Sequence, residues 1–144
     1  MSYFSFEDLD VWKRGCRVAV EICSLLRDSR EWGLRDQMIR AAISISSNIA
    51  EGAERSTPRD FARFLDVARG SAAELRTQLY IAVRAEMVSD QAANSLIMEL
   101  KEISSMLYSL SQQQRAKVKE EDPSHFTLNT SHSPDTSHSA AEPR

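Results

Sequence analysis

The sequence holds few of the residues that enzymes use to move protons or to bind metals. Its three histidines, His125, His132 and His138, all lie in the C-terminal part of the chain. The rest of the chain has no imidazole to act as the base of a Ser–His or Cys–His nucleophile, or as a ligand in a di-iron helical bundle. The four glycines are isolated, which excludes a glycine-rich phosphate loop. We therefore expect no enzymatic activity, no catalytic residue, no metal site and no cofactor.

Cysteines and long apolar runs are also scarce. The two cysteines, Cys16 and Cys23, lie about 10 Å apart on a helix, which is too far for a disulfide. We expect both to be buried as small hydrophobic side chains. No apolar run approaches the roughly 20 residues of a membrane span, and the first residues lack a signal-peptide pattern. The chain is therefore expected to be cytoplasmic and to avoid membranes. With a net charge of −3, it lacks the overall basic field of a dedicated nucleic-acid binder.

Four stretches carry apolar residues at helical spacing, at about 6–27, 34–51, 58–86 and 90–110. Thr57 and Pro58 make a strong helix start, because threonine is a good N-cap and proline suits the first helical position. Ser89 and Asp90 are expected to begin the last helix in the same way. Four long amphipathic helices with short connections predict an all-α fold, an up-down-up-down antiparallel four-helix bundle.

The bundle domain is expected to span residues 1–115. Beyond Gln112 the apolar period stops, and residues 116–144 are rich in Ser, Thr, His and Pro, which predicts a disordered C-terminal tail. Within the bundle, the first helix has two adjacent apolar stripes, more than a bundle alone needs to cover. This width predicts a homo-oligomer. The stripes consist of Trp12, Cys16, Ala19, Cys23 and Leu26, and of Val11, Gly15, Val18, Ile22 and Leu25.

Polar residues follow the flanks on which the second and third helices are expected to meet. One interpretation is a buried hydrogen-bond network that fixes the helix register, with Arg69 or Arg40 pairing Glu51 or Glu74. The other interpretation is a ligand or partner site between the two helices. The residues of this predicted network or partner site are Arg40, Ser44, Asn48, Glu51, Ser71 and Glu74.

Small residues and arginines mark the third helix. A glycine within a helix costs about 1 kcal/mol relative to alanine, so Gly70 and Ala72 are predicted to form a close-packing notch against the second helix. The arginines of the third helix form either a solvated, salt-bridged face or a stripe that binds nucleic acid when an oligomer repeats it. This predicted nucleic-acid stripe consists of Arg59, Arg63, Arg69, Arg76 and Arg84.

The chain resembles the bacterial four-helix bundle proteins that are encoded within the intervening sequences of 23S rRNA genes. The resemblance covers nearly all of residues 4–110. Its motifs occur in order along the chain: FEDLDVW at 6–12, GLRDQMIRAAISISSNIAEG at 33–52, and FARFLDVARGSAAELRTQL at 61–79.

This resemblance implies a cytosolic bundle that assembles as a homopentamer and has no known enzymatic activity. The same family includes the accessory variability protein of diversity-generating retroelements, which resembles a pentameric barrel and binds nucleic acid and its reverse transcriptase. That branch is markedly basic, whereas this chain is nearly neutral. We expect a non-catalytic oligomeric adaptor whose partners are itself, RNA or another protein. Two hypotheses stay open: a protein-only scaffold that docks a polymerase or reverse transcriptase, and a metal-dependent enzyme that uses Glu51 or Glu74.

Overall fold

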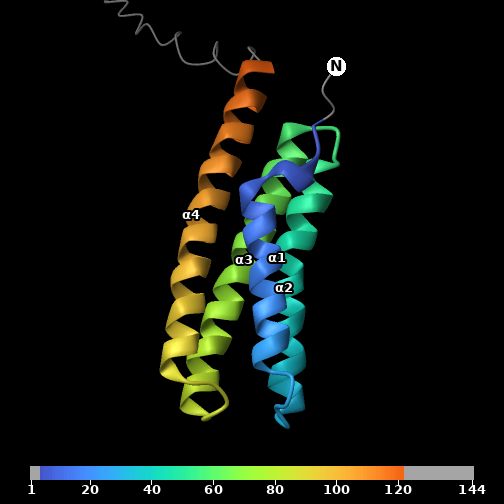
Figure 1. Cartoon of the computed structure of the whole chain (residues 1–144). Helices are drawn as coiled ribbons and strands as arrows, with labels where there is room; N and C mark the ends of the chain where they lie inside the picture. The colour runs from blue at the N-terminus through green and yellow to red at the C-terminus, as the bar shows by residue number, and fades with distance from the viewer. Residues whose placement is uncertain (1–3, 122–144) are drawn as a thin grey trace, which may run out of the picture.

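The computed structural model describes residues 4–121 and is an up-down-up-down antiparallel four-helix bundle (Figure 1). A short 3-10 turn, η1, precedes the four α-helices of the described residues, and no strand occurs among them. The predicted all-α bundle is confirmed. The elements are η1 (Phe6–Asp8), α1 (Asp10–Leu25), α2 (Trp32–Ala53), α3 (Pro58–Arg84) and α4 (Asp90–Glu121).

The predicted helix starts of α3 and α4 are confirmed by their capping bonds. The Thr57 hydroxyl accepts a hydrogen bond from the backbone N–H of Asp60 at 3.2 Å, and Pro58 occupies the first helical position. The Ser89 hydroxyl accepts one from the N–H of Ala92, also at 3.2 Å. Each cap satisfies an amide that the first helical turn would otherwise leave without a partner.

The core is a single cluster of apolar side chains along the bundle axis. α3 packs extensively on both α2 and α4, whereas α1 packs mainly on α2 and touches α4 less. The lighter α1–α4 seam leaves room for the polar clamp described below. The largest fully buried side chains come from all four helical segments and include Ile22, Met38, Ile45, Leu65, Leu75, Leu79, Leu100, Ile103 and Leu107.

Two glycines allow close helix approach, and neither is the one predicted. A Cβ on Gly52 would lie 2.6 Å from Phe64 Cβ, and Gly15 lies directly against Ser46 and Ile45. Gly70 is exposed, and a Cβ there would meet nothing within 4 Å. The predicted notch at Gly70 is therefore wrong, although its neighbour Ala72 is fully buried in the core.

The ends of the first and last helices also differ from the prediction. The first segment is broken at Leu9, whose extended backbone separates η1 from α1. α4 continues through Glu121, past the boundary expected at residue 115, so residues 116–121 are helical rather than a tail. Just before residue 115, the polar residues Ser111 and Gln114 are buried. The buried face of α4 therefore continues through polar residues. The rest of the predicted tail, 122–144, lies outside the described residues.

The cysteine prediction was wrong for Cys23, which is exposed, while Cys16 is partly buried. Burial of α1 follows the stripe that contains Val11, Val18 and Ile22. Within residues 4–121, no helix is both long and apolar enough to cross a membrane.

Candidate functional site

The predicted polar network between α2 and α3 exists, but it is smaller than expected. The Ser44 and Ser71 hydroxyls lie 2.8 Å apart and join the two helices. The Asn48 amide donates to both the Ser44 carbonyl and the Ser44 hydroxyl, at 2.8 and 2.9 Å. Because Ser71 is buried and the other two are partly buried, these bonds satisfy polar groups that would otherwise be costly in the seam. This geometry supports the interpretation as a register-fixing network.

The three charged residues predicted for this network lie outside it. Glu51 forms a 3.1 Å ion pair with Arg55, which lies just after the end of α2, and Glu74 accepts a 3.4 Å hydrogen bond from Gln78 of its own helix. Arg40 is exposed and borders a shallow surface hollow. The expected pairing of Arg40 or Arg69 with Glu51 or Glu74 is therefore wrong, because each carboxylate contacts a residue four positions further along the chain.

The arginines predicted to form one stripe on α3 lie in different surroundings. Those near the middle of the helix lie on the side that faces α4. The Arg69 guanidinium stacks over the Tyr108 ring at 4.9 Å and lies 3.8 Å from Asp66. Arg76 follows two helical turns later on the same face, and both arginines are partly buried. Arg84 is exposed at the far end of α3. The face is therefore an α3–α4 seam rather than a free stripe on one helix.

The first turns of α3 and the last turns of α4 complete this seam. Arg115 of α4 forms an ion pair with Asp66 of α3, and a hollow of about 370 Å³ lies beside this pair. We call this hollow the α3–α4 pocket. It is lined by Arg59, Arg63, Asp66, Arg115 and Lys119 around a floor of Ala62 and Val118. We call the following residues the basic seam: Arg59, Arg63, Arg69, Arg76, Arg115 and Lys119.

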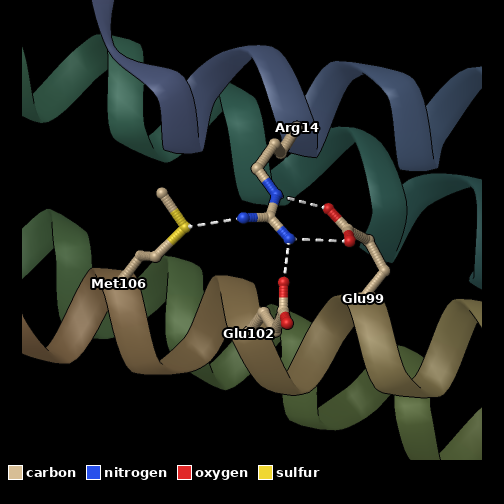
Figure 2. A network of polar contacts seen from close by, with 4 residues as sticks. All are labelled: Arg14, Glu99, Glu102 and Met106. Atoms are coloured by element: carbon tan, nitrogen blue, oxygen red, sulfur yellow. Dashed lines mark hydrogen bonds and ion pairs between the residues drawn. The ribbon is translucent and has the colours of Figure 1, made fainter.

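Arg14 clamps α1 to α4 and was missed by the sequence analysis (Figure 2). Its Nε and Nη2 donate to the two carboxylate oxygens of Glu99 at 2.6 and 2.8 Å. Nη2 also donates to Glu102, and Nη1 lies 3.4 Å from the sulfur of Met106. The hydrogen bonds from Arg14 hold the pKa of the Glu99 carboxyl below its usual value, against the opposing effect of burial. The clamp therefore holds a charged pair where α1 packs lightly.

Replacing Glu99 by glutamine should reduce the free energy of unfolding at neutral pH by about 1 kcal/mol, a modest amount because the pair is partly exposed. A carboxyl with a lowered folded pKa stabilises the protein above its unfolded pKa of about 4.5. That contribution is lost as the pH falls through the lower folded pKa. Urea unfolding at pH 7 and pH 3 should show wild type and E99Q converging in acid.

The control for this prediction is Glu102→Gln, which changes the same helix by the same chemistry. Its side chain is 66% exposed, so we expect a loss of at most about 0.5 kcal/mol. Equal losses in both variants, or a difference between wild type and E99Q that does not narrow as the pH falls from 7 to 3, would contradict the role assigned to the Arg14–Glu99 pair.

The outer side of α1 and α2 carries apolar side chains that the bundle does not cover. Val20 is 69% exposed and Ile43 is 49% exposed. Ser46 of α2 touches α1 through a 3.3 Å hydrogen bond to the Trp12 carbonyl, which places its neighbours by helical spacing beside α1. We call this surface the α1–α2 apolar face. It comprises Trp12, Cys16, Ala19, Val20, Cys23, Ile39 and Ile43.

The described residues contain no group of three or more His, Cys, Asp or Glu side chains placed to hold a metal ion. These residues form a four-helix bundle that carries the α1–α2 apolar face, the basic seam and the hydrogen bonds of Ser44, Asn48 and Ser71. The fold defines the class as an all-α four-helix bundle protein.

The family can be assigned from residues 7–109, which match the model of the 23S rRNA-intervening sequence proteins. The chain belongs to this family. It is also similar to a crystal structure from Bacteroides thetaiotaomicron VPI-5482, described as a protein with unknown function from the S23 ribosomal protein family. The two share 26% sequence identity with a TM-score of 0.66, over 70% of this chain and 97% of the other. No curated protein matches.

Proposed function

We propose that this protein is a non-catalytic, cytoplasmic, homo-oligomeric adaptor that binds RNA along the basic seam. The observation that carries the proposal is the convergence of cationic side chains from α3 and α4 on one seam, with Tyr108 among them. Arginine binds phosphates through two parallel hydrogen bonds, and aromatic rings stack on unpaired bases.

Self-association is supported by the α1–α2 apolar face. Monomeric proteins rarely leave large contiguous apolar patches in water, and Val20, Ile43 and the partly buried Trp12 lie on this one face. We propose a homopentamer, related in assembly to the accessory variability protein of diversity-generating retroelements. A closed ring would repeat the basic seam around its axis, so a nearly neutral chain would present several equivalent sites for a polyanion.

Native mass spectrometry of the protein purified gently from its own cells tests the proposal as a whole. We expect a five-fold assembly with additional mass that ribonuclease removes. A bare ring would contradict the RNA partner and leave the oligomer, whereas a monomer at micromolar concentration would contradict the oligomer.

Replacing Arg69 and Arg76 together by glutamine should weaken RNA binding about tenfold or more, irrespective of sequence. Each lost phosphate contact should reduce the slope of log affinity against log salt by about 0.7 for a single strand. Fluorescence anisotropy over a salt series measures both quantities. The matched control is Arg27→Gln with Arg30→Gln, which removes the same charge from exposed positions between α1 and α2. Equal effects of the two double variants would contradict a role for the seam.

A protein-only scaffold that docks a polymerase or reverse transcriptase remains the second candidate. It is favoured by the net charge of −3 and by the intramolecular partners of the seam, since Asp66 pairs with both Arg69 and Arg115. Association with a protein partner that survives high salt and nuclease treatment would support it over the RNA adaptor.

A further inference from the structure

The α3–α4 pocket differs from the rest of the basic seam because it is concave. Its volume of about 370 Å³ lies within the roughly 300–1,000 Å³ typical of small-ligand sites. The floor is apolar: Ala62 is 2% exposed and Val118 is partly buried. A ligand can therefore lay a sugar or base against the floor while an anionic group faces the cationic rim.

The rim carries more positive charge than its own carboxylate neutralises. Asp66, the one acidic residue of the lining, is engaged by Arg115 and lies 3.8 Å from Arg69. Within residues 4–121, Arg59 and Lys119 form no ion pair at all. These two exposed cations come from different helices and border the same hollow.

Arg63 is the third exposed cation of the rim and is held loosely. Its guanidinium lies 3.9 Å from the Asp60 carboxylate and stacks over the Phe64 ring at 4.7 Å. The stacking fixes the side chain, and the long, weak ion pair is made by Nε, so within residues 4–121 the two Nη nitrogens form no ion pair. Asp66 in turn fixes Arg115 from the inner side of the pocket.

We propose that the α3–α4 pocket binds the terminal phosphate of an RNA strand. This inference rests on the proposed function, since it places one end of the strand that the basic seam holds. Arg69 and Arg76 are about 10 Å apart along their helix, a spacing suited to separate backbone phosphates that carry one charge each. At the pocket, several cations converge on one hollow, which suits a phosphate monoester with a charge of about −1.5 to −2 at neutral pH.

The test compares one short single-stranded RNA, labelled internally, in three forms: with a 5′-phosphate, with a 3′-phosphate, and with hydroxyls at both ends. Fluorescence anisotropy with the full chain measures the three affinities. We expect one phosphorylated form to bind about tenfold more tightly than the hydroxyl form, and the form that does so identifies the bound end. Inorganic phosphate in excess should abolish the difference.

The variant that tests the pocket is Arg59→Gln with Lys119→Gln, both at exposed positions. It should reduce the preference for the phosphorylated end to about onefold, and it should weaken the hydroxyl form by no more than the Arg69 and Arg76 double variant does, since each variant removes two cations of the basic seam. Arg76→Gln, the control within the seam, should weaken all forms by the same factor and preserve the preference.

Three results would overturn the assignment: no preference in the wild type, a preference that persists in the pocket variant, or a preference that Arg76→Gln removes equally well. Equal binding of all forms, still weakened by the Arg69 and Arg76 double variant, would overturn the pocket alone. Absence of binding by every form would overturn the RNA adaptor together with the pocket.

Discussion

Alanine at position 52 is expected to destabilise the bundle by about 2–3 kcal/mol, although alanine is the better helix former. A Cβ on Gly52 would lie 2.6 Å from Phe64 Cβ and 3.3 Å from the Phe61 carbonyl oxygen. Neither atom can move by a side-chain rotation, because a Cβ and a carbonyl are fixed to their backbone. The C-terminal end of α2 must therefore move away from the N-terminal end of α3. This movement reduces the packing of side chains in the dense core. Urea unfolding should show the loss as a lower transition midpoint.

Gly70→Ala is the matched control, because it makes the same chemical change in the neighbouring helix. Gly70 is exposed within α3, and a Cβ there meets nothing within 4 Å. This variant should be more stable than wild type by about 0.5–1 kcal/mol, the gain in helix propensity. Loss of stability in G70A at monomer-forming dilution, or none in G52A, would contradict this reading of the helix contacts.

Gly15→Ala should fall between these two variants. The nearest atom to the added Cβ is the Ser46 hydroxyl, the end of a side chain that can rotate away. The rotation gives up the 3.3 Å hydrogen bond to the Trp12 carbonyl, so a loss of about 1 kcal/mol is expected.

The glycines illustrate what the sequence could not predict. Gly15, Gly52 and Gly70 all lie within helices, and the helical period alone does not say which of them faces a neighbour at short distance. That depends on the crossing point of two helices, which is set by tertiary packing. Gly52 lies in the last turn of α2 and is buried against Phe64 and Phe61.

The fold itself was predictable because local and global signals agree. Thr57 with Pro58, and Ser89 with Asp90, mark helix starts by chemistry that acts within one turn, and both caps form. Apolar spacing located the core stripes of all four helices. It failed from Ser111 onward, because Ser111 and Gln114 occupy buried positions and interrupt the apolar pattern while α4 continues.

The interaction sites were predicted less completely, because they join residues far apart in sequence. Spacing along α3 identified Arg69 and Arg76, but Arg115 and Lys119 were assigned to the last residue of the domain and to the tail. Their place beside Asp66 and Arg59 follows from the antiparallel pairing of α4 with α3. The Arg14–Glu99 ion pair likewise joins α1 to α4. No local sequence pattern indicates that these two residues form a pair.

Introducing glutamate at both Val20 and Ile43 is expected to convert the proposed oligomer to monomers without unfolding the bundle. Val20 and Ile43 are exposed on the α1–α2 apolar face, so the substitutions leave the core of each chain intact. In an assembly that covers this face, each buried carboxylate would lose its hydration without gaining a partner, which costs several kcal/mol. The combined effect should weaken association about a thousandfold or more. Analytical ultracentrifugation measures it, and circular dichroism verifies the fold.

The control places the same two charges at Gln37→Glu on α2 and Thr77→Glu on α3, which are exposed polar positions away from the apolar face. This variant should assemble as wild type does, because its carboxylates stay in water. Dissociation of both variants would show that added charge alone disrupts the assembly. Persistence of the oligomer in V20E/I43E would mean that the α1–α2 apolar face is not the surface on which the chains meet.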